Sequence, residues 1–362
     1  MEPTFGYAFP AIRGIQAGRE YYVSMCPIRL IPKIFLFNEE ELVPELRAQR
    51  TLNKARIPEI ARYILKNRIG YVFSAITASI DGEVSFLPIE SNSNGGRVGT
   101  LQVSMDSKFI INDGQHRRAA IEMALRECAE LGDETIAVVF FLDVGLQRCQ
   151  QMFADLNRYA IRPSPSLGVL YDHRDSLAQL ARLIIMRSSF FRDIAEMERT
   201  TLSPRSRKLF TLSALYNATS ELLNGLDEKE SARIAIEYWE EVAKQIPEWG
   251  LVRERKMAAG EVRQDFIHSH GIVLQALGNI GNTLLREYKS SWKRKLKNLK
   301  KVDWSRSNRK VWEGRAMIGG RVSKATQNVT LTTNALRKAL NLEFTPEGRR
   351  AEDALNRSSH GS

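Results

Sequence analysis

The residues best suited to chemistry lie in a turn between an apolar run and a helical pattern. Residues 109–125 read FIINDGQHRRAAIEMAL, where the apolar run ends at Asn112 and Asp113 and a helix starts directly after Gly114. Gly114 permits a tight turn, and the free N–H groups at the start of a helix favour an anion. The pattern therefore predicts a phosphate-binding turn.

Four side chains around this glycine carry the groups that such a site needs. Arg117 and Arg118 offer planar, permanently charged guanidinium groups to phosphate oxygens. His116 can donate to a phosphate or move a proton near neutral pH. Asp113 can cap the helix or hold a divalent cation. The alternative is an architectural turn, in which Asp113 is only an N-cap and the arginines are solvated.

A second candidate site is a basic segment near the C-terminus. The chain has 362 residues and a formal net charge of +11, and the 39 residues from Arg286 to Lys324 contain 14 basic and three acidic residues, which accounts for all of that charge. Clustered cations bind nucleic-acid phosphates because each neutralised phosphate releases condensed counterions. The segment therefore predicts binding of double-stranded DNA. A solvated helix face, an acidic protein partner and a membrane surface remain alternatives.

The cations of this basic segment are interleaved with three tryptophans. Trp292, Trp304 and Trp312 can stack on bases or anchor the segment to the rest of the protein. No helix there is marked clearly enough to be predicted as a recognition helix. The cations assigned to DNA binding are Lys293, Arg294, Lys295, Lys297, Lys300, Lys301, Arg309 and Lys310.

The composition excludes several classes of protein. Apolar residues make up 43% and charged residues 26% of the chain, which is ordinary for a globular protein. The three cysteines lie far apart and the five histidines are scattered, which argues against a disulfide framework and against a cysteine- or histidine-rich metal site. The N-terminus lacks the pattern of a signal peptide, and no apolar run reaches the ~20 residues of a membrane span. We expect a cytoplasmic, nucleoid-associated protein.

The elements that position the turn belong to a mixed N-terminal pattern. Asp81 and Gly82 predict a turn that pairs residues 71–80 and 83–89 as a hairpin. Runs of β-branched and aromatic residues predict strands within 20–37, 71–80, 83–89, 101–105, 108–112 and 134–144. Helical spacing predicts helices within 44–67, 115–130 and 145–157.

The pattern changes after the proline- and serine-rich loop at 162–166. From there to about residue 290 the spacing is helical, and the tail predicts a helix and a turn, with the last dozen residues loose. The sequence therefore predicts an α+β protein with three parts: an α/β domain at 1–165, a helical domain at 166–285 and a basic C-terminal region at 286–362.

The turn also resembles the signature of a known family. INDGQHRRAAI at 111–121 is similar to the motif of the DGQHR-domain proteins, which resemble the ParB/sulfiredoxin-like group, and residues 151–166 are similar to the element that follows the motif. The stretch GRAMIGGRVSKATQNVTLTTNALRKALNLEFTPE, at 314–347, narrows the resemblance to the DndB family. Members of this family are encoded with the bacterial machinery that replaces a non-bridging phosphate oxygen of DNA by sulfur.

The resemblance implies a fold, partners and a cofactor. The fold would be α+β, with a mixed-sheet domain of the ParB/sulfiredoxin-like kind at the N-terminus. The partners would be double-stranded DNA, including the promoter of the modification genes, and other phosphorothioation proteins, with negative regulation of the modification as the outcome. Related domains bind and hydrolyse nucleoside triphosphates, which implies ATP or another NTP with Mg²⁺. The alternative function is an NTP-dependent enzyme that acts within the DNA modification complex.

By motif position, the resemblance implies a phosphate-binding turn made of Asp113, Gly114, Gln115, His116 and Arg117. In an NTPase, Asp113 would hold Mg²⁺, Gln115 or His116 would position water, and Arg117 would stabilise charge on the transferring phosphoryl group. Gln115 stands where sulfiredoxins have their catalytic cysteine, so reduction of sulfinic acids is not supported. The chain also has no G-x-x-x-x-G-K-[ST] motif, so an NTPase would not be of the P-loop type. The phosphate-binding set is completed by Asn112, Gly114, Arg118, Asn157 and Arg158.

Other residues carry a functional and a structural interpretation. Asn157 and Arg158 either reach the turn from a neighbouring element or lie at the end of a helix, since asparagine ends helices well. For His268 and His270, helix capping or core packing is favoured over metal binding. A second basic cluster is expected to be a solvated face, with a place beside the nucleotide or the DNA as the alternative, and comprises Arg47, Arg50, Lys54 and Arg56.

Overall fold

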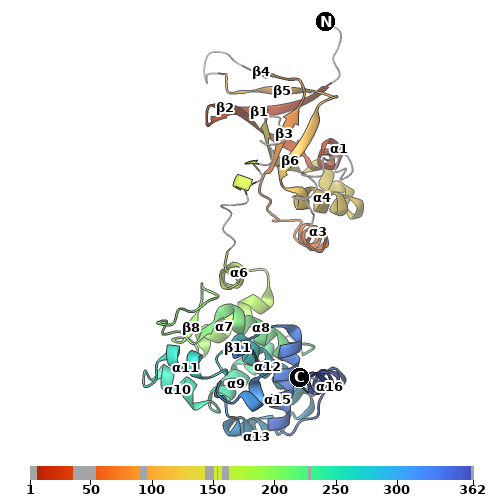
Figure 1. Ribbon diagram of the computed structural model, residues 1–362. Helices are drawn as coiled ribbons and strands as arrows, with labels where there is room; N and C mark the ends of the chain where they lie inside the picture. Colours follow the sequence, from red (N-terminus) through yellow and green to blue (C-terminus); the bar gives the residue numbers. More distant parts are fainter. Residues whose placement is uncertain are drawn as a thin grey trace. The chain divides into compact units, whose positions relative to one another are not determined.

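The chain forms two compact units. The computed structural model describes residues 6–35, 54–89, 96–142, 151–152, 154–156, 163–226 and 230–359. One unit comprises residues 1–161 and the other residues 162–362, and each has its own buried apolar core. The first contains a mixed seven-stranded sheet and the second is mainly helical, so the predicted α+β class is confirmed (Figure 1).

The sheet of the first unit has the order β4-β5-β1-β2-β7-β3-β6. β3 and β7 run parallel, and the other neighbouring strands run antiparallel. Alternate residues of each strand face the core; in β7 these are Ile136, Val138 and Phe140. The strands are β1 (Gly6–Gln16), β2 (Arg19–Pro27), β3 (Ile76–Asp81), β4 (Val84–Pro88), β5 (Val98–Ser104), β6 (Lys108–Asp113) and β7 (Thr135–Phe141).

The predicted hairpin between 71–80 and 83–89 is wrong. β3 forms only from Ile76 onward and pairs with β6 and β7, whereas β4 pairs with β5. Most of β3 is buried, so it lies between two partners inside the sheet, while β4 is largely exposed and forms an edge. A local turn signal identifies where a strand ends, but it does not determine which distant strand becomes the partner.

The strand expected within 20–37 is shorter than predicted. β2 ends at Pro27, and the chain continues in the helical turns η1 (Ile28–Leu30) and α1 (Ile31–Ile34). Pro32 lies in the first turn of α1, where a missing N–H removes no helical hydrogen bond. The apolar residues of this stretch are therefore buried by a helical turn instead of a strand.

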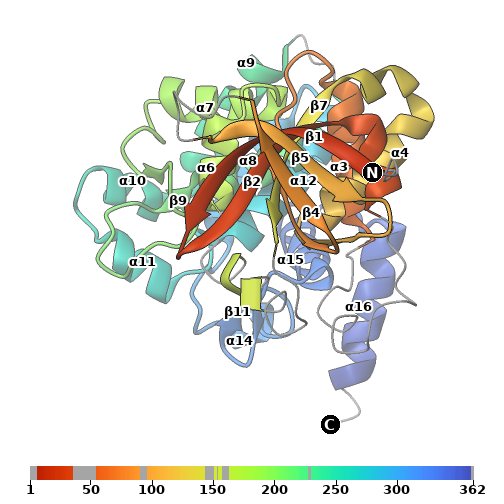
Figure 2. The same ribbon diagram turned by 90° about the horizontal axis from the view of Figure 1, so that it is seen from above.

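Three helices gather on one side of this sheet (Figures 1 and 2). α3 (Arg56–Lys66) and α4 (Gln115–Glu127) pack against each other, and α1 packs against α4. A further turn, η2 (Ala129–Asp133), connects α4 to β7. Within the ranges expected to be helical, 44–67 and 115–130, the structure has α3 and α4. Residues 44–53 and most of the helix expected at 145–157 lie outside the described residues.

The second unit is organised around one buried helix. α12 packs against α8 and α15, and it buries residues on most of its faces (Figures 1 and 2). The helices are α6 (Pro165–Tyr171), α7 (Ser176–Arg187), α8 (Leu212–Leu223), α9 (Ser231–Ala243), α10 (Pro247–Arg253), α11 (Ala259–Asp265), α12 (Gly271–Glu287), α13 (Trp292–Leu296), η4 (Lys297–Lys301), α14 (Arg309–Trp312), α15 (Thr326–Ala339) and α16 (Pro346–Ser359). Short strands form the pairs β8 (Ala195–Glu196) with β9 (Phe210–Thr211) and β10 (Met317–Ile318) with β11 (Arg321–Val322).

A glycine sets how closely α12 approaches α8. A Cβ on Gly278 would collide with the carbonyl oxygen of Ala218, whereas a Cβ on Gly250 in α10 would meet no atom within 4 Å. We expect Gly278→Ala to lower the free energy of unfolding by about 1–3 kcal/mol because the helices must separate. Gly250→Ala is the matched control and should raise it by about 0.4–1 kcal/mol. Urea unfolding of both variants checks this, and equal stabilities would contradict the packing.

The basic C-terminal region shares the core of the second unit. Trp292, Trp304 and Trp312 belong to the same buried cluster as Trp239 of α9. The tail is also ordered further than expected, because α16 continues through residues 351–359, which were predicted to be loose. No described helix has the length and apolar character needed to cross a membrane.

Candidate functional site

The strand, turn and helix of the DGQHR motif form where the pattern predicts them. β6 ends at Asp113, Gly114 has a φ of +113°, and α4 begins at Gln115. A Cβ on Gly114 would lie 3.1 Å from Ile76 Cγ1 and 3.2 Å from Arg117 Nη2. Both the left-handed backbone and the close neighbours therefore require glycine at this position.

Two amide side chains of the motif brace the turn from inside. Asn112 is fully buried, and its Nδ2 donates to Ser79 Oγ at 2.8 Å. Its Oδ1 is buried and has no hydrogen-bond partner. Gln115 is also buried, and its Nε2 donates to the carbonyl oxygen of Ile111 at 3.2 Å. Asn112 therefore ties β6 to β3, whereas Gln115 uses its amide nitrogen to tie the start of α4 to β6.

Arg117 is held at the turn by two contacts. Its Nη2 donates to Asp113 Oδ2 at 2.7 Å and to the carbonyl oxygen of Ala75 at 3.0 Å. Its Nε is buried without a partner. The Asp113 carboxylate remains substantially exposed, with 42% of its side chain accessible, against 20% for Arg117. The ion pair therefore fixes the guanidinium direction while leaving one face of the carboxylate open to solvent.

His116 lies among cations. Burial lowers the pKa of His116 below its ordinary value, and the positive charges of Arg56 and Arg117 lower it further, against a smaller opposing effect of Asp113. Arg56 is the first residue of α3, so two helices bring positive charge to the imidazole. A group of Arg56, His116 and Arg117 is suited to an anion, whose charge would favour protonation of the imidazole.

Arg118, predicted to bind phosphate, is used within the fold. It is buried, its Nε donates to the carbonyl oxygen of Phe35 at 2.9 Å, and its Nη2 donates to that of Pro32 at 3.2 Å. Its Nη1 pairs with Glu122 one turn along α4. These contacts tie α1 and the residue after it to α4.

The structural role of Arg118 can be tested by measuring the free energy of unfolding of variants. Arg118→Met should lower the free energy of unfolding by about 1–3 kcal/mol, because it leaves buried carbonyl oxygens without a donor. Arg126→Met on the same helix should cost less than about 0.5 kcal/mol, because Arg126 is 75% exposed and, among the residues that the structure describes, pairs only with Glu122. Urea unfolding measures both, and a neutral Arg118→Met would assign the residue to the surface instead.

Two residues predicted at the turn, Asn157 and Arg158, lie outside the described residues. The same is true of Arg47 and Arg50 of the second basic cluster. Within the described ranges, no group of three or more His, Cys, Asp or Glu side chains is arranged to hold a metal ion. Mg²⁺ commonly uses one or two carboxylates and takes its other ligands from substrate phosphates and water. Asp113 fits that pattern only as a single carboxylate.

The basic segment places its tryptophans inward and most of its cations outward. Trp292, Leu296 and Leu299 are buried at helical spacing along α13 and η4. The tryptophans therefore anchor the segment to the core and are not available to stack on bases. Trp312 confirms this arrangement, because it is fully buried and stacks on Trp304 with 5.8 Å between the ring centres. Its Nε1 donates to the carbonyl oxygen of Asp303.

The predicted DNA-binding cations divide into two groups. Lys293 pairs with Glu237, and Lys295 Nζ lies 4.2 Å from the ring centre of Tyr288. Both are thus engaged within the second unit. The others are exposed, and their side chains form no hydrogen bond or ion pair within the described part of the chain: Arg294, Lys297, Lys300, Lys301, Arg309 and Lys310.

The sequence reasoning missed a second exposed basic group. Arg205 and Arg207 lie on the loop between β8 and β9 and are also without partners in the described ranges. Arg263 of α11 holds this loop, because its guanidinium donates to the carbonyl oxygens of Ser203 at 2.6 Å and Ser206 at 3.2 Å. The available signal was the run SPRSRK at 203–208, which contains three cations.

The buried histidines pack as predicted. His268 is fully buried, and its Nδ1 accepts from Trp249 Nε1 at 2.9 Å. Its Nε2 lies 3.5 Å from Glu248, and burial lowers the pKa of His268. His270 Nε2 lies 2.9 Å from the carbonyl oxygen of Arg263, and burial lowers its pKa to about 4. Both rings belong to the packing of the second unit.

Comparison with known proteins identifies the family. Nothing among curated proteins or solved structures matches the chain significantly. A family model described as DndB, DNA-sulfur modification-associated, matches residues 9–343. This match includes the DGQHR turn, the helical middle and the basic segment. The chain therefore belongs to the DndB family, which is associated with the sulfur modification of DNA.

Proposed function

We propose that this protein is a DNA-binding regulator of DNA sulfur modification that represses the modification genes. The observation that carries the proposal is the exposed, unpartnered cation set of the basic segment, above all Arg294, Lys297, Lys300 and Lys301. Buried tryptophans hold this segment on the core of the second unit. The cations are thus presented on an ordered surface, which lowers the ordering entropy that binding must offset.

The choice of DNA over other acidic partners rests on charge and family. Exposed lysines and arginines without counter-charges release phosphate counterions on binding, so such a surface gains most from a polyanion. Because the family is associated with DNA sulfur modification, we infer that this polyanion is DNA. A membrane surface gains little support, because the tryptophans of the segment face the core.

A titration with DNA tests this proposal. Fluorescence anisotropy should detect binding to duplex DNA that weakens linearly in log–log form with salt, with a slope magnitude of about 4 to 5 for five or so phosphate contacts. Duplex from the promoter of the modification genes should bind at least about tenfold more tightly than a shuffled duplex, as a regulator requires. Salt-independent binding, or no preference for the promoter, would contradict the regulator.

The second candidate function is an NTP-dependent enzyme within the modification complex. The observation that favours it is the cluster of His116 with the cations Arg56 and Arg117 at the first turn of α4. In this proposal the turn binds the phosphates of ATP or another NTP, and Asp113 contributes to holding Mg²⁺. Arg117 stabilises charge on the transferring phosphoryl group, and His116 or Gln115 positions water.

The two functions are compatible. A nucleotide that binds one conformation better than another shifts the population toward it, and this shift can alter affinity for DNA. Other phosphorothioation proteins are the proposed partners in either case, and the nucleoid is the proposed location.

A further inference from the structure

The second unit contains a cavity that neither proposed function uses. Its volume is about 800 Å³, which falls in the range of ligand sites, roughly 300–1,000 Å³. Its walls come from the basic segment between Val302 and Trp312, from the second half of α15, and from the connection that leads into α16. One of the cations predicted to bind DNA, Lys310, also lines this cavity.

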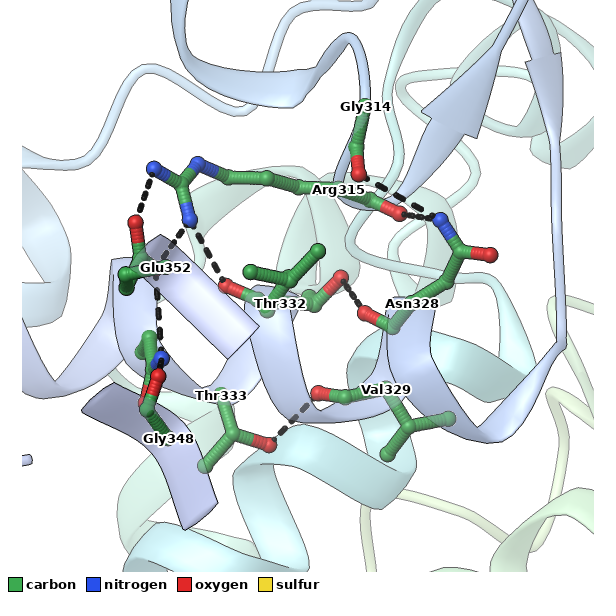
Figure 3. A network of polar contacts seen from close by, with 10 residues as sticks. Gly314, Arg315, Asn328, Val329, Thr332, Thr333, Gly348 and Glu352 are labelled. Carbon is green, nitrogen blue, oxygen red and sulfur yellow. Dashed lines mark hydrogen bonds and ion pairs between the residues drawn. The ribbon is translucent and has the colours of Figure 1, made fainter. Parts of the chain in front are cut away.

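A closed polar network forms one wall of this cavity. Arg315 binds both carboxylate oxygens of Glu352, and Asn334 Nδ2 donates to Glu352 Oε1 at 3.2 Å and to the carbonyl oxygen of Gly348 at 2.8 Å. Asn328 Nδ2 donates to the carbonyl oxygen of Arg315 at 2.6 Å (Figure 3). The network fastens α16 and the segment before α15 to α15 itself, so the cavity is built on fixed elements.

The charges that remain at the cavity are mostly positive. Four basic and three acidic residues line it, and two of each cancel in the pairs Arg315–Glu352 and Arg349–Glu343, the latter at 3.5 Å. The charges left after this pairing are two positive ones, Lys310 and Lys338, and one negative one, Asp303. Both lysines are exposed, and neither side chain has a partner within the described ranges. Their ammonium groups are free to bind an anion.

The rest of the lining is apolar or carries amides. Val302, Val311, Leu342 and Phe344 offer apolar surface, and Asn308 lies among them with an amide that can both donate and accept. A ligand for this lining needs a flat apolar body, polar edges and an anionic group. A nucleotide has all three, because its base stacks on apolar and aromatic side chains while its phosphate binds ammonium groups.

We propose that this cavity binds one nucleotide unit, with the base against Phe344 and Val302 and the phosphate at Lys310 and Lys338. The same chemistry comes from two sources: a free nucleotide, or a nucleotide that leaves the stack of DNA lying on the basic segment. The second source rests on the proposed DNA-binding function, and the first does not.

The test uses the full chain and two probes. The first probe is free dAMP, titrated by calorimetry, and the second is a DNA duplex with a central 2-aminopurine, whose fluorescence rises when the base leaves the stack. Two variants alter the cavity: K338E/R349E reverses charges that line it, and A335L fills it without changing charge. The matched control is R350E/R357E, which reverses two charges on α16 that do not line the cavity.

Both cavity variants should lower the affinity for dAMP at least about tenfold, the effect of one lost charge-assisted phosphate contact or of excluded volume. The control should change it less than about twofold. If the DNA is the source, 2-aminopurine fluorescence rises with wild type and control and stays low with A335L, although anisotropy still reports bound DNA. A dAMP response with a silent 2-aminopurine identifies the free nucleotide as the ligand.

The overturning results are distinct. Equal dAMP affinity in wild type and both cavity variants, together with equal 2-aminopurine signals, excludes the cavity. The same holds if neither probe responds to wild type, or if R117A, in the first turn of α4, removes dAMP binding while the cavity variants do not. Failure of duplex DNA to bind at all would refute the DNA-binding function, and the dAMP titration would still decide the cavity.

Discussion

Replacing Arg294, Lys297, Lys300 and Lys301 with alanine is expected to weaken duplex DNA binding about a thousandfold at about 0.1 M salt. Each phosphate contact contributes about 0.9 to the slope of log affinity against log salt, so four lost contacts lower the slope magnitude by about 3.6. The difference from wild type should shrink toward zero as the salt concentration approaches about 1 M. Fluorescence anisotropy over a salt series measures both quantities.

The variant should stay folded. All four side chains are exposed and have no partners in the described part of the chain, so their loss should change the free energy of unfolding by less than about 0.5 kcal/mol each. The control is R350A/R357A, which removes two exposed arginines of α16. It should leave the slope of log affinity against log salt unchanged. A quadruple variant that keeps the wild-type affinity and slope would remove this segment from the DNA-binding surface.

The structure refines which cations to change. Lys293 and Lys295 lie at the centre of the basic run but are engaged with Glu237 and with the ring of Tyr288. Alanine at Lys293 removes an internal ion pair as well as a charge, so its effect on DNA binding would be harder to interpret. A K293A/K295A variant should therefore lose less DNA affinity per charge than the quadruple variant.

If the turn before α4 is an active site, replacing Arg117 with alanine is expected to lower the rate of NTP hydrolysis about 10²- to 10³-fold. The guanidinium is aligned by Asp113 and by the carbonyl oxygen of Ala75, with its Nε buried and unpartnered. Such a prearranged cation stabilises charge that develops on a phosphoryl group without having to reorganise. Phosphate release at saturating NTP and Mg²⁺ measures the effect.

Two variants sharpen this experiment. Arg117→Lys keeps the charge but loses the planar fork, and it should recover only part of the activity. Arg126→Ala removes an exposed arginine from the same helix, far from the turn, and should leave the rate unchanged. An architectural turn predicts the opposite pattern, in which wild type neither binds nor hydrolyses NTP, and Arg117→Ala changes only stability.

Local features of this protein follow from its local sequence. The turn at Gly114 forms as predicted because a single left-handed residue between an apolar run and a helical pattern leaves few other conformations. The helices α3 and α12 follow from apolar spacing in the same way. The family also follows from the sequence, because the motif and nearly all of the C-terminal stretch lie within residues 9–343, which the DndB model matches.

Contacts between distant residues required the tertiary structure. β3 pairs with β6 and β7 instead of with β4, because the burial of a central strand outweighs the nearby turn. Likewise α16 stays helical to Ser359, because Arg315 and Asn334 bind Glu352 from elements far along the chain. Neither contact has a signal within a short window of sequence.

The division of charged residues into structural and available ones is also tertiary. Arg117 and Arg118 are identical neighbours in the sequence, yet Arg118 is consumed by the carbonyl oxygens of Pro32 and Phe35 while Arg117 lies at the turn. On a helix, consecutive residues point about 100° apart, so one faces α1 and the other faces the start of the helix. The sequence determined that positive charge is concentrated at the start of α4, and tertiary packing decided which of these side chains can bind a ligand.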